Sequence, residues 1–257
     1  MDGNLKVYVV FRSTPEGRRA ARFAASVAGV RGELHVLLPS EPVDCGESER
    51  LLGKVAEFAQ ARTDSFGWHG RDRADFLHAG NPETFDFGDA VVVDGPLASV
   101  RRDASVIAPQ FETALFGRGA GPALVPFGDR ESALRAMELG LPILRGCGFG
   151  EIVFYHTTWR ADGVASENPE DHMNDAAREV LTNLRNLADL ASVRHRTIVE
   201  TADSIPAGIQ RAALRNGCRL VVTARDPERF GHTYVDEMIE DAPTPVLVVG
   251  NKKEVKR

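Results

Sequence analysis

The chain has 257 residues, 43% of them hydrophobic, with a formal net charge of −6 and an isoelectric point near 5.7. A chain of this size can bury one large core or two smaller ones. The acidic balance argues against a nucleic-acid partner, because proteins that follow a phosphate backbone concentrate Lys and Arg. No apolar run approaches the roughly 20 residues that cross a bilayer. We therefore expect a soluble, cytoplasmic protein with neither a nucleic-acid nor a membrane partner.

The first half of the chain alternates predicted strands with predicted helices. Four apolar runs predict strands: LKVYVVF (5–11), ELHVLL (33–38), DAVVVD (89–94) and ASVIAP (104–109). Helices are predicted over 15–28, which is rich in Ala, and over 51–59. No helix is predicted between 80 and 89, where NPETFDFG leads directly into the next strand. The Gly-rich segment 116–122 is typical of a linker.

The second half shows the same alternation more clearly. Five β-branched runs predict strands: PALVPF (122–127), EIVFYH (151–156), RTIVE (196–200), RLVVTA (219–224) and PVLVVG (245–250). Apolar residues at three- and four-residue steps predict helices over 134–144, 177–191 and 205–213. Pro142 lies inside the first of these and should end or kink it. Apolar strands that alternate with helices predict a parallel sheet covered on both faces.

The two halves also resemble each other in sequence. Phe11, Arg19 and Ala20 recur at a constant spacing as Phe127, Arg135 and Ala136. This pattern suggests a repeat whose first copy has lost a helix, with domains at 1–118 and 119–257. We expect the two domains to pack as an intramolecular pseudo-dimer with VLVVG near the interface. We also expect each domain to keep its own sheet.

Four segments of the second half resemble, in order, successive segments of a universal stress protein domain. They are ALVPFGDRESALRAMELG (123–140), FYHTT (154–158), IQRAALRNGCRLVVTARD (209–226) and DAPTPVLVVG (241–250). The whole chain resembles the tandem form of this family. The resemblance implies two doubly wound parallel-sheet domains, adenine nucleotide alpha hydrolase-like in fold, the first of them eroded. It also implies pairing with a protein partner or with a second copy through the last strands.

Many members of that family bind ATP through a loop of pattern G-x-x-G, nine residues, G-[ST]. Here Ala224 and Pro227 take the positions of the first two glycines, and Thr233 takes that of the Ser/Thr, in a shorter loop. Glycines let backbone N–H groups turn toward phosphate oxygens, and proline has no N–H to offer. We therefore expect ATP, or another adenine nucleotide, to bind weakly or not at all.

Two interpretations of this loop remain open. Arg225 and Arg229 could bind a small anion bidentately, next to the helix N-terminus at Gly231 and Thr233. Alternatively, Thr233-x-x-Asp236 is a capping box that only begins a helix, and the arginines are solvated loop charges.

The resemblance places three further candidates at the same cleft. Phe127 ends the first strand of the second half, and Asp129 matches a family Asp that holds the base and ribose. Asp129 could equally cap the helix that begins near Glu131. Thr157 follows the second strand, at the carboxyl edge where open α/β sheets bind ligands, although it could also be a loop residue. The first half keeps no G-x-x-G after its fourth strand, so we expect it to supply an interface and no nucleotide site.

Motifs of other chemistries are absent from the sequence. There is no Walker loop, no G-x-G-x-x-G and no G-x-S-x-G, and neither the seven histidines nor the three scattered cysteines have metal-ligand spacing. No catalytic residue and no metal ligand is therefore predicted. Two functions remain: a regulatory or binding protein of the stress response, or an adenine-nucleotide-binding protein with slow ATPase activity. The missing phosphate cradle favours the first, which is not an enzyme.

Overall fold

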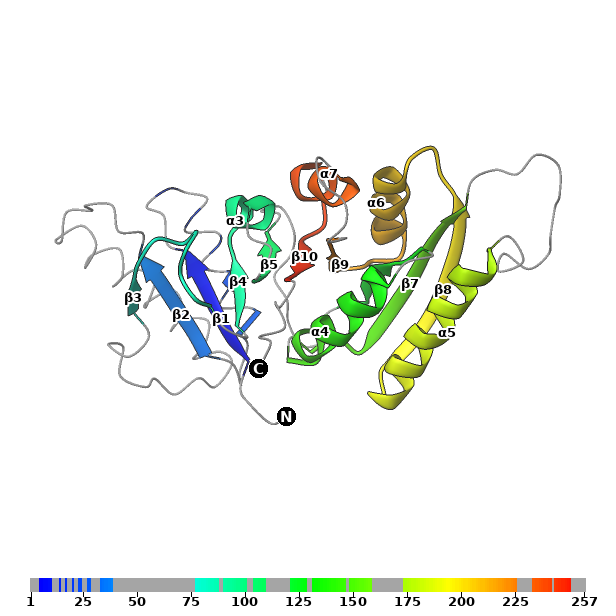
Figure 1. The fold of residues 1–257 in the computed structure, drawn as a ribbon, viewed down its shortest axis with the longest axis horizontal. Helices are drawn as coiled ribbons and strands as arrows, with labels where there is room; N and C mark the ends of the chain where they lie inside the picture. The colour runs from blue at the N-terminus through cyan, green and yellow to red at the C-terminus, as the bar shows by residue number, and fades with distance from the viewer. Residues whose placement is uncertain are drawn as a thin grey trace, which may run out of the picture.

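The computed structural model describes residues 5–10, 14, 17, 20, 23–24, 27–28, 33–38, 77–87, 90–100, 104–109, 121–128, 131–146, 148–158, 173–225, 233–241 and 243–250. Within these residues, ten strands form one sheet in the order β3-β2-β1-β4-β5-β10-β9-β6-β7-β8 (Figure 1). Read inward from either edge, the strands of each half follow the same order, with the last strand of that half at the centre.

The first half contributes five strands, helix α3 and further helical residues between 17 and 28 to the described structure. The strands and α3 are β1 (Lys6–Val10), β2 (Glu33–Leu38), β3 (Leu77–Ala79), β4 (Val91–Val93), α3 (Gly95–Val100) and β5 (Ser105–Ala108). The described residues between 17 and 28 are helical and buried, at the spacing of one helix face, as the sequence predicts. The predicted helix over 51–59 lies outside the described residues. Helix α3 has only six residues, too few for a periodic pattern to predict it.

The second half contains all five predicted strands and the three predicted helices. The elements are β6 (Ala123–Pro126), α4 (Ser132–Gly146), β7 (Glu151–Thr158), α5 (Asp175–Leu190), β8 (Arg194–Thr201), α6 (Ile205–Arg215), β9 (Leu220–Ala224), α7 (Tyr234–Asp241) and β10 (Val246–Val249). The side chain of Asn174 caps α5 by accepting a hydrogen bond at 2.8 Å from the N–H of Ala177. Gly217, with φ of +62°, follows α6 in the left-handed region that favours glycine.

Of the two predicted effects of Pro142, an end or a kink of the helix, an end at this residue is wrong. The helix continues through Pro142 to Gly146. Pro142 lies near the C-terminus of α4 with its side chain exposed to solvent, so its ring avoids the packed face of the helix. Ile143 and Leu144, which follow it, are buried and hold the last turn against the core.

The two halves join through the only antiparallel strand pair in the described sheet. β10 pairs with β5, so that Leu247 lies opposite Ile107, whereas every other neighbouring pair is parallel. The expectation that each half keeps its own sheet is therefore wrong. The physical reason is that β5 and β10 would each present unpaired N–H and C=O groups as edge strands, and pairing with each other satisfies both.

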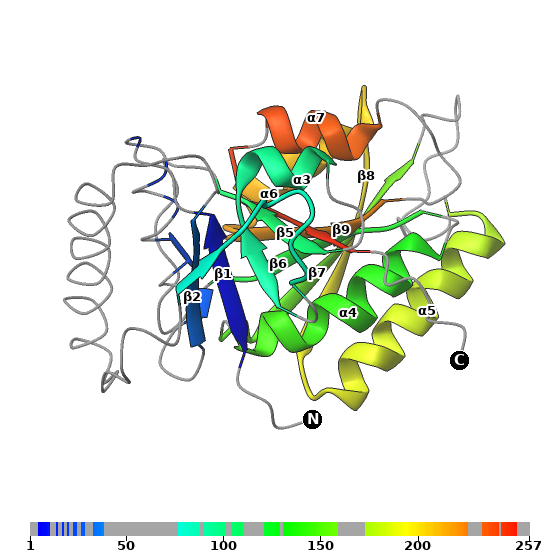
Figure 2. The same ribbon diagram turned by 60° about the vertical axis from the view of Figure 1, so that its left-hand side comes forward.

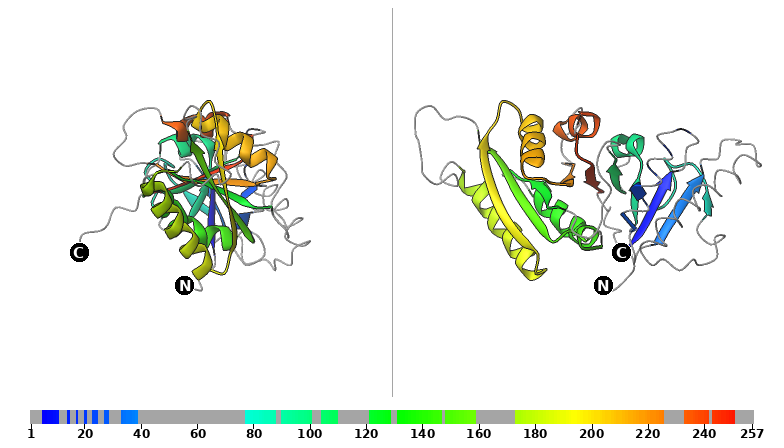
Figure 3. Two further views of the ribbon diagram at one scale, coloured as in Figure 1. Left: turned by 90° about the vertical axis from the view of Figure 1, so that its right-hand side faces the viewer. Right: turned by 180° about the vertical axis from the view of Figure 1, so that it is seen from behind.

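Helices cover both faces of this sheet. One face packs against α4 and α5, and the other against α3, α6 and α7 (Figures 2 and 3). The buried helical residues between 17 and 28 belong to the same core cluster as α4 and α5. In the first half, the described residues between β3 and β4 form a turn rather than a helix, as the sequence predicts. In the second half, α6 occupies that place in the chain between β8 and β9.

Candidate functional site

The carboxyl ends of β6 and β9 lie next to each other in the second half, since these strands are neighbours in the sheet. Phe127 follows β6 with its side chain buried in the core, and Ala224 ends β9 and is also buried. The N–H of Phe127 donates to the carbonyl of Tyr155 at 2.9 Å, and its carbonyl oxygen lies 2.9 Å from Nδ1 of His156. These contacts make Phe127 and Ala224 part of the structural frame at this edge.

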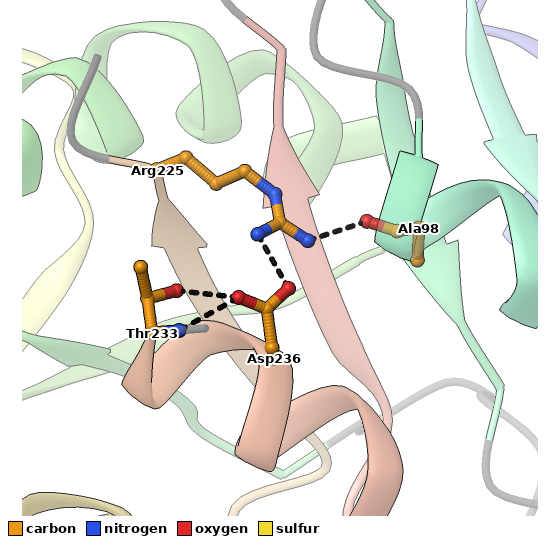
Figure 4. Close-up of polar contacts among 4 residues, drawn as sticks. All are labelled: Ala98, Arg225, Thr233 and Asp236. Atoms are coloured by element: carbon orange, nitrogen blue, oxygen red, sulfur yellow. Dashed lines mark hydrogen bonds and ion pairs between the residues drawn. The ribbon is translucent and has the colours of Figure 1, made fainter. Parts of the chain in front are cut away.

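Arg225, the first residue after β9, is buried with only 6% of its surface exposed. One terminal nitrogen of its guanidinium donates to Oδ1 of Asp236 at 2.6 Å, and the other donates to the carbonyl oxygen of Ala98 at 2.9 Å (Figure 4). Asp236 belongs to α7, whereas Ala98 belongs to α3 in the first half. The interpretation of Arg225 as a solvated loop charge is therefore wrong, because its guanidinium is buried and hydrogen-bonded to α7 and α3.

Thr233 and Asp236 form the start of α7. The N–H of Thr233 donates to Oδ2 of Asp236 at 2.8 Å, and the Thr233 hydroxyl donates to the same oxygen at 2.9 Å. The backbone N–H of Asp236 donates to the Thr233 carbonyl at 2.9 Å, which closes the turn. The predicted helix start is therefore present, with the Asp236 side chain supplying the cap.

The electrostatics of this cluster centre on Asp236. Burial opposes ionisation of its carboxyl group, but hydrogen bonds from the backbone and side chain of Thr233 and from Arg225 outweigh burial and lower its pKa below the usual value of 3.8. Asp236 is thus a carboxylate at neutral pH and neutralises the buried guanidinium. Arg225, Asp236 and Thr233 together form a cluster that we call the Arg225 cluster.

Thr157 lies apart from the Arg225 cluster. It is in β7, which is separated from β9 by β6, and it is paired with Glu200 of β8. Its hydroxyl lies near α6, 3.4 Å from the point where a Cβ on Gly208 would lie. The sequence places Thr157 correctly at the carboxyl edge, but two strands away from Arg225.

Three of the sequence candidates lie outside the described residues: Asp129, Arg229 and Gly231. Pro227 also lies there. Their roles stay predictions, as does anion binding by Arg225. An anion that approached Arg225 would compete with Asp236 and Ala98 for the guanidinium.

In the first half, the residues that follow β4 enter a helix directly. Asp94 is buried, its N–H lies 3.2 Å from the carbonyl of Ile107, and its own carbonyl lies 3.3 Å from the N–H of Ala98 in α3. Gly95 and Pro96 are the first two residues of α3. In the second half, by contrast, residues 226–232 stand in the chain between β9 and α7, and they lie outside the described residues. Sequence reasoning missed the role of Asp94 and Ala98, because their contacts with Ile107 and Arg225 join distant parts of the chain.

No cluster of three or more His, Cys, Asp or Glu side chains is placed to hold a metal ion within the described ranges. Among the helices that the structure describes, none has the length and apolarity to span a membrane. Cys218 is buried, and burial raises the pKa of its thiol to about 11, so it is a poor nucleophile at neutral pH.

Comparisons with known proteins place the fold among known structures. No protein-family model and no curated protein matches the chain. The structure is similar to that of a universal stress protein from Archaeoglobus fulgidus DSM 4304, with a TM-score of 0.64 at 12% identity over 98% of this chain and 100% of that chain.

Shorter structures match about half of the chain. A protein of the universal stress protein family from Burkholderia pseudomallei has a TM-score of 0.40 at 17% identity, over 52% of this chain and 99% of its own. A universal stress protein family protein from Arabidopsis thaliana, with AMP bound, has a TM-score of 0.38 at 19% identity, over 51% of this chain and 91% of its own. The full-length match to the Archaeoglobus protein shows that the chain has the fold of a universal stress protein over nearly its whole length.

Proposed function

We propose that the protein is a regulatory or binding protein of the universal stress type that acts through protein contacts, and in which ATP binding is weak or lost. One observation carries this proposal. Both terminal nitrogens of the Arg225 guanidinium, at the start of the loop that would hold phosphates, are hydrogen-bonded inside the protein to Asp236 and Ala98.

The Arg225 cluster opposes phosphate binding for a physical reason. A phosphate that took the guanidinium would have to displace Asp236, leaving a partly buried carboxylate without its cation and close to a second anion. The backbone offers little compensation, because Ala224 is buried at the first glycine position and Pro227 has no N–H. At most, a small anion binds near Gly231 and Thr233 at the start of α7.

The last strands of the two halves are already paired with each other. β5 and β10 lie in the interior of the sheet, so their backbone groups are used within the chain. A protein partner that bound through these strands, as expected from the sequence, would have to separate the two halves. The proposed partner therefore contacts another surface of the protein.

Calorimetric titration tests the proposal on nucleotide binding. The full chain is stripped of any bound ligand and titrated with ATP in the presence of Mg²⁺, with AMP and inorganic phosphate as separate titrants. We expect a dissociation constant weaker than about 1 mM, which corresponds to a binding free energy less favourable than about −4 kcal/mol. If Arg225 and Arg229 substitute for the missing backbone donors, any weaker binding that exists should disappear in the variant Arg225→Ala/Arg229→Ala.

Matched variants separate loss of the site from loss of the fold. Arg229→Ala alone leaves the Arg225 cluster intact, and Arg215→Ala removes an arginine whose exposed ion pair with Glu200 lies elsewhere. Tight, stoichiometric ATP binding that survives the double change would refute the proposal and favour a slow ATPase. Thermal melts with a panel of small anions then identify any other ligand, since a ligand that binds only the folded form raises the midpoint.

A further inference from the structure

Three ring-bearing residues of the first half occupy sheet positions that are apolar in the second half. Tyr8 of β1 lies opposite His35 of β2, and His78 of β3 lies opposite Leu37 of β2. The same register in the second half brings Leu124 opposite Val153, and Tyr155 opposite Ile198. Tyr8, His35 and His78 thus stand where Leu124, Val153 and Ile198 stand in the second half.

Different elements pack over these two sets of residues in the two halves. In the second half, Leu124 and Val153 share a core with residues of α6: Ile209, Ala212 and Ala213. In the first half, the described chain between β3 and β4 forms the turn 80–87 instead of a helix. Phe85 and Phe87 of that turn pack on the Tyr8 ring, with centroid distances of 5.7 and 5.3 Å. Two histidines therefore lie under a short turn, in a place where the other half has a helix.

His35 and His78 are joined directly to each other. Nδ1 of His35 lies 3.0 Å from Nε2 of His78, and the ring planes differ by only 28°. Nε2 of His35 lies 3.4 Å from Oε2 of Glu33. A carboxylate only accepts hydrogen bonds, so Nε2 of His35 carries the proton, Nδ1 accepts, and Nε2 of His78 donates. Glu33, His35 and His78 form a chain of hydrogen bonds across β2 and β3.

While His78 carries its proton on Nε2, this chain requires His35 to be neutral. A second proton on His35 would place an N–H on Nδ1, opposite the N–H of His78, so that two donors would face each other unless His78 moved its own proton to Nδ1. Burial lowers the pKa of His35 below its ordinary value of 6.5, and His78 and Lys6 of β1 act in the same direction, whereas Glu33 opposes them. Two further ionisable groups among the described residues belong to this region: Tyr8, whose pKa is raised by burial, and Asp86 of the turn, which acts on Tyr8.

We propose that Glu33, His35 and His78 form a pH-sensitive clasp that holds the edge strand β3 and the turn 80–87 on the sheet at neutral pH, and that protonation of His35 releases them. Edge strand β3 has only three residues, and β2 is its one neighbour in the described sheet. His78 also contacts Phe85, with ring centroids 5.8 Å apart, so the clasp connects β2 to the turn. Release would expose the edge of β2 and the aromatic face of the first half.

The direction of the pH effect follows from linkage. Because the pKa of His35 is lower in the closed form, the open form binds more protons below the ordinary value of 6.5. The clasp is therefore fully effective above pH 6.5 and is lost as the pH falls from 6.5 through the lower pKa of the closed form.

Hydrogen exchange of the full chain, followed by mass spectrometry, tests the proposal. Exchange of a peptide covering 77–87 is measured between about pH 5 and pH 7.5 and corrected for the intrinsic rate. In the wild-type protein, the opening equilibrium is expected to rise by up to about tenfold per pH unit below 6.5. Residues 220–224 in β9, which contain no ionisable side chain and lie inside the sheet, serve as the internal reference.

The variant His35→Val/His78→Ile carries the residues found at the matching positions of the second half. It is expected to lose the pH dependence of the 77–87 peptide, whatever its exchange rate at neutral pH. His195→Gln is the matched control, because His195 pairs with the exposed Asp189 outside the clasp, and it should keep the wild-type behaviour. Unchanged pH dependence in the double variant, or none in the wild type, would overturn the proposal.

A measurement on the wild-type protein covers the case in which the double variant does not fold. Two-bond nitrogen–proton NMR spectra of the imidazole rings report the tautomer of each histidine. We expect a proton on Nε2 and none on Nδ1 of His35 at neutral pH. A proton on Nδ1 of His35 at neutral pH would overturn the proposal, because the hydrogen-bond chain could not then form.

Discussion

The guanidinium of Arg225, in the second half of the chain, donates a hydrogen bond of 2.9 Å to the carbonyl oxygen of Ala98, 127 residues earlier in the first half. The same guanidinium is paired with Asp236, so a single buried side chain links the end of β9 to helices of both halves. The two halves are therefore joined by a side-chain contact as well as by the backbone pairing of β5 with β10.

Replacing Arg225 by alanine is expected to destabilise the protein strongly. Breaking a buried pair leaves the remaining charge without compensation, at a cost of about 3–5 kcal/mol. Arg215→Ala is the control, because Arg215 is 59% exposed in its pair with Glu200 and should cost about 1 kcal/mol or less. Urea denaturation measures both. An Arg225→Ala loss no larger than that of Arg215→Ala would contradict a structural role for the cluster.

Acid should lower the free energy of unfolding, partly through protonation of Asp236. The pKa of this carboxyl is lower in the folded state than its usual value of 3.8, so its stabilisation is present above pH 3.8 and is lost as the pH falls through the lower folded value. The variant Asp236→Asn is expected to show a shallower loss of unfolding free energy between about pH 5 and pH 2. Glu237→Gln, which removes the exposed carboxylate next along α7, should keep the wild-type slope.

Gly250 tests the packing at the junction of the halves. A Cβ added there would lie 2.5 Å from the carbonyl carbon of Ala104, and this backbone has little room to move beside β5. Gly250→Ala is therefore expected to cost about 1–3 kcal/mol in unfolding free energy, as overpacking does. Gly150→Ala is the control, since a Cβ at Gly150 meets nothing within 4 Å. Equal thermal midpoints for the two variants would show that the junction tolerates the added atom.

The proposed division into domains at 1–118 and 119–257 gives a separate prediction. Residues 119–257 produced alone would leave β10 without its partner β5, with unpaired backbone groups along a hydrophobic strand. We expect this fragment to self-associate through β10, as measured by sedimentation across a range of concentrations. A fragment that stays monomeric at high concentration, while remaining folded by circular dichroism, would argue against β10 as the shared surface.

Secondary structure in the second half followed closely from the sequence pattern. All five apolar runs are strands. β6, β9 and β10 are buried along their whole length and β7 is buried over Ile152–Tyr155, as apolar strands inside a covered sheet are, whereas β8 is an edge strand and only partly buried. Pro142 shows where this reasoning fails for the end of a helix, because α4 continues through it. The local penalty for proline was outweighed by the burial of Ile143 and Leu144 in the next turn.

The candidate site was only partly accessible to sequence reasoning. The Thr233-x-x-Asp236 spacing identified the start of α7, because a capping interaction is local in sequence. The burial of Arg225 was missed, since the residue follows an apolar strand as any loop arginine would and its partner Ala98 belongs to the other half. The pairing of His35 with His78 was also missed, because the two residues lie on different strands and far apart in the sequence.

The sequence by itself determined the alternation of strands and helices, the turn in place of a helix among the described residues 80–87, and the residues that replace glycine after β9. These features depend on residue type and on periodicity within one segment. Only the tertiary structure decided that the two halves share one sheet, that Arg225 is buried between them, and that two histidines bond across neighbouring strands. Each of these depends on which backbone edges and polar groups remain unsatisfied after the local elements form, and partners far away in the sequence satisfy them.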